Sequence, residues 1–60
     1  MTALSEFLKS QAECDALATH LRNIISNNFD THPDEITYAD VGTVKKVASD
    51  LQEILKFLGV

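Results

Sequence analysis

The stretch Ile36-Thr37-Tyr38-Ala39-Asp40-Val41 has the residue pattern of the start of a long helix. Thr37 is a suitable N-cap residue, and Asp40 follows it three residues later, where a capping-box carboxylate belongs. Ile36 before the cap and Val41 one turn inside the helix form the apolar pair of a hydrophobic staple. The segment therefore predicts that a helix begins at about Tyr38, after a bend in the chain.

Apolar residues continue from this start at helical spacing, which predicts a helix over about residues 38–58. In heptad notation they are Val44, Leu51 and Leu58 at a, Val47 and Ile54 at d, and Val41, Ala48 and Leu55 at e. Gly59 stands where a C-terminal glycine cap belongs. Gly42 in the first turns lowers helix stability by about 1 kcal/mol relative to Ala, and it would permit close approach of another backbone.

A matching pattern in the first half predicts a helix over about residues 3–28, with Thr2 or Ser5 as its cap. Its stripe consists of Phe7, Cys14 and Leu21 at a, Leu17 and Ile24 at d, and Leu4, Ala18 and Ile25 at e. Asn27 and Asn28 favour a helix end, and Pro33 disfavours helical geometry at His32. A bend over about residues 29–36 should join the two helices.

The expected fold is an all-α antiparallel hairpin that occupies residues 1–60 as one domain. Each stripe is wider than the narrow seam that two helices bury against each other, so the remaining apolar surface needs a partner. Two hairpins that form a four-helix bundle meet this need, and so does a hairpin that docks onto a different protein. The pattern leaves the docking orientation open. The residues expected in the core or interface are Phe7, Cys14, Leu17, Leu21, Ile24, Ile25, Val44, Val47, Leu51, Ile54, Leu55 and Leu58.

The composition points away from several function classes. The chain has 60 residues, a formal charge of −4 and one cysteine, Cys14, which excludes a disulfide within a single chain. No secretory signal pattern and no apolar run of membrane-spanning length is visible, so we expect a cytoplasmic protein without membrane attachment. No catalytic constellation or cofactor motif is present. We therefore expect a small homodimeric adaptor or regulator of another protein, with neither enzymatic activity nor a cofactor.

One alternative function is metal binding in the bend. Asp30, His32, Asp34 and Glu35 bring together the oxygen and imidazole ligands that divalent ions use. Their spacing differs from that of an EF-hand loop, which needs ligands at alternate positions, a central glycine and a glutamate at the twelfth position. Without a metal, this segment would be a solvated turn.

The segment His32–Gly42 resembles a stretch in small bacterial and phage proteins of no assigned function, in which a Pro, a branched aliphatic residue, an aromatic residue and a Val-Gly pair lead into a final helix. The expected architecture is also similar in shape to the Rop family of RNA-binding hairpin dimers. That likeness implies RNA binding as a second alternative. A Rop-like protein needs a basic face, whereas Lys9, Arg22, Lys45, Lys46 and Lys56 are scattered along this chain.

Overall fold

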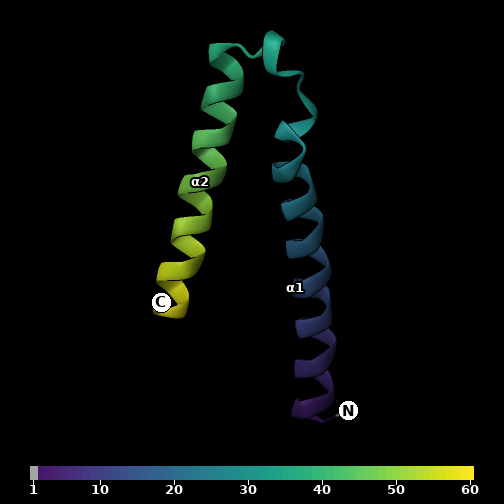
Figure 1. The fold of residues 1–60 in the computed structure, drawn as a ribbon. Helices are drawn as coiled ribbons and strands as arrows, with labels where there is room; N and C mark the ends of the chain where they lie inside the picture. Colours follow the sequence, from purple (N-terminus) through teal and green to yellow (C-terminus); the bar gives the residue numbers. More distant parts are fainter. Residues whose placement is uncertain (1) are drawn as a thin grey trace.

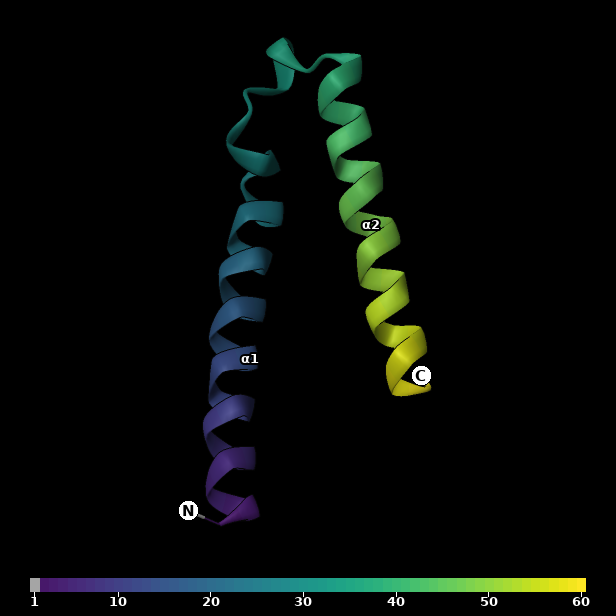
Figure 2. The ribbon, with the colours of Figure 1, turned by 180° about the vertical axis from the view of Figure 1, so that it is seen from behind.

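In a computed structural model, which describes residues 2–60, the chain forms two long helices joined by two short turns of three residues each. In order, they are α1 (Ala3–Ser26), η1 (Asn28–Asp30), η2 (Pro33–Glu35) and α2 (Tyr38–Leu58). The two long helices run in opposite directions (Figures 1 and 2). No strand occurs in residues 2–60, so the prediction of an all-α chain with two helices is confirmed.

Helix α1 begins at the first of its two candidate caps. The Thr2 hydroxyl oxygen accepts a hydrogen bond of 3.1 Å from the backbone N–H of Ser5. The helix ends at Ser26, earlier than the expected residue 28, and the N–H of Asn27 donates to the carbonyls of Asn23 and Ile24 at 3.1 and 3.2 Å. The helix ends earlier because Asn28, Phe29 and Asp30 do not adopt helical backbone angles.

Segment η1 is a left-handed turn. Its residues Asn28, Phe29 and Asp30 have φ angles of 56°, 55° and 58°. Hydrogen bonds hold it: the Asp30 N–H donates to the Asn27 carbonyl at 2.9 Å, and the Thr31 N–H donates to the Asn28 carbonyl at 3.0 Å. Asparagine and aspartate tolerate this conformation, whereas an ordinary L-residue such as phenylalanine is destabilised there by about 1–2 kcal/mol. The left-handed turn ends α1 and turns the chain toward the bend.

Helix α2 is capped at both ends, as the sequence predicts. The Thr37 side chain accepts from the Asp40 N–H at 3.4 Å, and the Asp40 carboxylate accepts from the Thr37 N–H at 2.9 Å, which completes a capping box. At the other end, Gly59 has φ +81° and its N–H donates to the Lys56 carbonyl, while the Val60 N–H donates to the Leu55 carbonyl. This pair of bonds is a Schellman motif.

The two long helices stand apart and diverge toward their free ends (Figure 1). No Cα atom of α1 lies within 8 Å of a Cα atom of α2. The axes of two packed helices are about 8–10 Å apart, so their facing Cα atoms lie much closer together than 8 Å. The two long helices are therefore not packed against each other. The molecule is correspondingly elongated, with extents of 50 × 21 × 15 Å.

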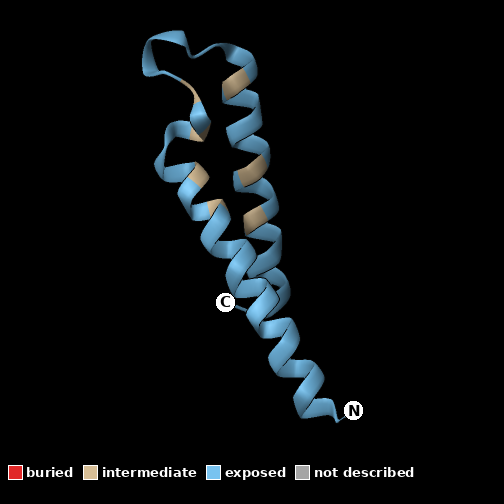
Figure 3. Cartoon of the chain, turned by 90° about the vertical axis from the view of Figure 1, so that its right-hand side faces the viewer, coloured by how far each residue is buried: buried red, intermediate tan, exposed pale blue. Residues whose placement is uncertain are grey.

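No residue in the described range is buried, and the half-buried residues gather in the half of the hairpin nearer the bend (Figure 3). They are Leu21, Ile24, Phe29, Thr31, Asp40, Val47 and Leu51. The single hairpin therefore has no closed hydrophobic core.

Candidate interaction surface

The part of the apolar surface nearest the bend faces inward between the helices. Leu21 and Ile24 on α1, and Val47 and Leu51 on α2, are half-buried. Beside them Ile25 and Val44 are each 41% exposed. Here the stripes predicted from the sequence lie on the facing sides of the two helices, although the helices are too far apart for close packing.

Toward the free ends the same stripes are uncovered, and we call this part the open-end surface. On α1, Phe7 and Leu17 are each 64% exposed and Cys14 is exposed. On α2, the open-end surface consists of Ile54, Leu55 and Leu58, which are 54%, 51% and 64% exposed. Thus every residue expected in the core or interface remains at least partly accessible in a single chain.

A groove runs along the hairpin where both long helices contribute to one hollow. This side groove has a volume of about 480 Å³, and Leu51 of α2 lines it opposite α1. The α1 residues that line it are Ala18, Leu21, Arg22, Ile25 and Ser26. Its floor is therefore mainly aliphatic.

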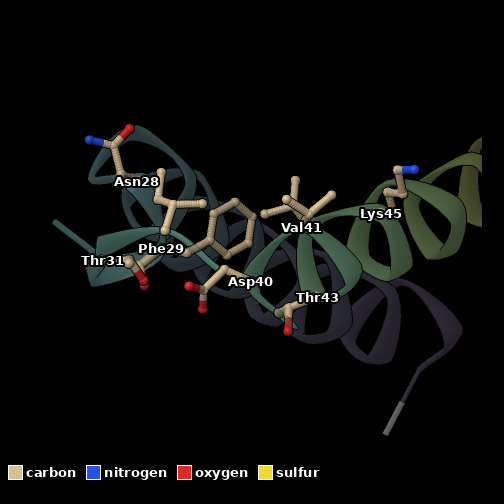
Figure 4. Close-up of a pocket in the computed structure, with 9 residues that line it drawn as sticks. Asn28, Phe29, Thr31, Asp40, Val41, Thr43 and Lys45 are labelled. Atoms are coloured by element: carbon tan, nitrogen blue, oxygen red, sulfur yellow. The ribbon is translucent and has the colours of Figure 1, made fainter. Parts of the chain in front are cut away.

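A second hollow, which we call the bend hollow, lies between the left-handed turn and the first turns of α2 (Figure 4). Its volume is also about 480 Å³. In Figure 4 the ring of Phe29 lies on the side toward Val41. The apolar residues that line the bend hollow are Phe29, Ile36, Val41 and Val44, and the polar ones are Asn28, Thr31, Asp40, Thr43 and Lys45.

The sequence singled out Ile36 and Val41 as a staple pair, Asp40 as a cap residue and Val44 as a stripe residue, but it did not predict that they line one hollow with Phe29. Ile36 and Val41 also line a smaller hollow together with Thr37 and Tyr38. Phe29 lies beside the stripes in the sequence, which favours an aromatic cap on the end of the core, but no sequence signal marks a phenylalanine for a left-handed turn. The hydroxyl of Thr31 donates to the carbonyl of Phe29 at 3.2 Å and helps to hold it there.

Several apolar side chains outside the stripes are strongly exposed. Tyr38 at the start of α2 is 94% exposed, and Phe57 near its end is 88% exposed. Leu8 on α1 is 53% exposed. Neither aromatic ring covers an end of the single hairpin.

The acidic bend does not gather its candidate metal ligands. The His32 Nδ1 atom accepts from the Asp34 backbone N–H at 3.2 Å and lies 3.8 Å from an Asp34 carboxylate oxygen. Across residues 2–60 no group of three or more His, Cys, Asp or Glu side chains is placed to hold a metal ion. The geometry instead shows His32 acting as a cap for η2.

The basic residues lie in different local settings. Lys46 pairs with Asp50 at 3.2 Å one turn along α2, and both side chains are largely exposed. Arg22 lines the side groove, and Lys45 lines the bend hollow.

Neither long helix combines the length and the apolar content needed to cross a membrane. Comparison of the chain with protein-family models, curated proteins and solved structures found no match.

Proposed function

We propose that the protein is an intracellular homodimeric helical hairpin that acts as an adaptor or regulator of another protein and catalyses no reaction. The observation that carries the proposal is that two well-capped helices bury none of their apolar side chains and leave the open-end surface uncovered. Exposed apolar patches of this extent are typical of interaction sites.

The accessible area supports a second copy as the first partner. The chain exposes 5516 Å², whereas a folded monomer of its mass, 6.6 kDa, is expected to expose about 3,900 Å². A compact dimer of twice this mass would expose about 6,400 Å², so its formation would bury about 4,600 Å² in total. That area falls within the range of about 2,000–5,000 Å² for obligate homodimers.

The exposed aromatic residues supply a surface for a further protein. Tyr38 and Phe57 lie beside the stripes, so a bundle built on the stripes would leave them accessible. Aromatic side chains are enriched among the residues that dominate protein–protein binding. We infer that these two rings anchor the regulated protein on the outside of the dimer.

Equilibrium sedimentation at micromolar concentration tests the self-association. We expect a species of twice the chain mass, with helical circular dichroism. A well-folded species with the mass of one chain would overturn the homodimer. Leu51→Ala should weaken association, and Ser49→Ala on the same helix should leave it unchanged.

The adaptor role is tested with proteins recovered from the native cell by wild-type and variant chains. Tyr38→Ala or Phe57→Ala should lose one specific protein while the dimer mass stays the same. Recovery of the same proteins by wild type and by both variants would contradict the assignment of these aromatic residues.

A further inference from the structure

The distance between α1 and α2 indicates which positions the two helices of one chain would occupy in a four-helix dimer. Since no Cα atoms of α1 and α2 lie within 8 Å of each other, and Cα atoms lie about 2.3 Å from each helix axis, the axes are about 12 Å or more apart. Neighbouring helices in bundles are about 8–10 Å apart. In a square four-helix arrangement the diagonal distance is then about 11–14 Å. An axis separation of about 12 Å or more is too wide for directly packed neighbours, and its lower limit lies within the diagonal range.

The geometry points to an interleaved dimer, in which α1 and α2 of one chain occupy diagonal corners of a four-helix bundle and the helices of a second copy fill the other two corners. This inference rests on the proposed homodimer and specifies its docking. Each long helix would then contact both helices of the second copy, and the side groove lined by Ala18, Leu21, Ile25 and Leu51 would receive one of them.

The diagonal arrangement also fixes the orientation of the two bends. A twofold axis parallel to the helices would move each helix to the diagonally opposite corner. The α1 helices of the two chains would then be diagonal to each other, and α1 and α2 of one chain would be adjacent. A diagonal α1 and α2 therefore requires a twofold axis perpendicular to the bundle. Such an axis places the two bends at opposite ends.

The distribution of exposed apolar residues agrees with this orientation. With the bends at opposite ends, the open-end surface of one chain lies at the level of the bend hollow of the other. The open-end residues Ile54, Leu55 and Leu58 are all more than half exposed, and the bend hollow offers Phe29, Val41 and Val44 at the other end of the hairpin. Each chain thus carries the exposed open-end surface at one end and the apolar bend hollow at the other. In the dimer, the open-end surface of one chain would lie beside the bend hollow of the second.

The bend orientation is measured with a single spin label per chain. Asp34→Cys in a Cys14→Ala background places the label in the exposed bend, and Cys14→Ser is a second background should alanine disturb the dimer. For bends at opposite ends we expect a label separation of about 40 Å, because a helix the length of α1 is about 36 Å long. A dimer with labels closer than about 25 Å would overturn the inference and leave the homodimer standing, whereas a folded monomer would overturn both.

The diagonal placement is measured within one chain. Asn23→Cys and Ser49→Cys, both at exposed positions, are introduced in the same Cys14→Ala background, labelled together and diluted into excess unlabelled protein. Diagonal helices should give a label separation about 3–4 Å longer than adjacent helices with their axes about 8–10 Å apart. The singly labelled chains at the same dilution supply the background between chains. A separation that fits adjacent helices in the dimer would overturn the interleaved arrangement.

Discussion

The side chain of Thr37 and the carboxylate of Asp40 cap each other's backbone: Thr37 Oγ1 accepts from the Asp40 N–H at 3.4 Å, and an Asp40 oxygen accepts from the Thr37 N–H at 2.9 Å. The same carboxylate also accepts from the Thr37 hydroxyl at 3.1 Å. All three bonds lie within four consecutive residues. The position at which α2 begins is therefore set by contacts between neighbouring residues.

Thr37→Ala should lower the free energy of unfolding by about 1 kcal/mol, because it removes the hydroxyl from the N-cap. Urea denaturation at fixed protein concentration measures the change. Thr43→Ala is the matched control: Thr43 lies inside α2 and its hydroxyl bonds only to the Ala39 carbonyl, so we expect little loss or a small gain. Equal effects of the two substitutions would show that Thr37 is not the cap.

Leu51→Ala should lower the free energy of unfolding by about 2–5 kcal/mol, as buried Leu-to-Ala changes do. Leu51 is half-buried in one chain and lines the side groove, so association should complete its burial. Leu8→Ala makes the same chemical change outside the stripe and should have a much smaller effect. A loss below about 1 kcal/mol at Leu51 would place that residue outside the interface.

Asn28→Gly should stabilise the protein by up to about 1 kcal/mol, because glycine adopts a positive φ without steric cost. Asn27→Gly is the matched control, since Asn27 has φ −100° while Asn28 has φ +56°. At Asn27 glycine only adds flexibility to the unfolded chain and should destabilise. Thermal melting of the two variants measures both effects. A change in melting temperature of the same sign for both would contradict the left-handed conformation of Asn28.

Gly42→Ala should stabilise α2 by about 1 kcal/mol through helix propensity. An added Cβ at Gly42 meets no atom of the same chain within 4 Å, so the close approach that the sequence permits does not occur within one hairpin. Gly59→Ala should destabilise, because Gly59 has φ +81°. A weaker dimer of Gly42→Ala in sedimentation would show that the second copy packs closely against this position.

Salt should not weaken self-association. Each chain carries a formal charge of −4, so two chains repel each other at long range while their apolar stripes attract. Raising the ionic strength from about 0.05 to 0.5 M screens the repulsion and should leave the dimer equally tight or tighter. Sedimentation at both salt concentrations measures this. An RNA complex of the Rop-like alternative would instead weaken as salt rises.

The features that local chemistry determines were predictable from the sequence. The two long helices, the Thr37 cap and the Gly59 end each depend on residues a few positions apart, and the structure confirms them, while it selects Thr2 over Ser5 as the cap of α1. Phe29 could not be predicted because its left-handed conformation depends on the hydrogen bonds of the whole turn. The distance between the helices was likewise unpredictable, since a heptad pattern shows which side is apolar but not which helix covers it.

The absence of any fully covered side chain in residues 2–60 of one hairpin has a consequence for how the cell would regulate the proposed dimer. If chains become stable only by pairing, the quantity of folded protein rises with the square of the free chain concentration. Lowering synthesis by half would then remove more than half of the folded pool, and the unpaired remainder would be exposed to proteases. The amount of dimer would thus change more steeply than the amount of chain that the cell makes.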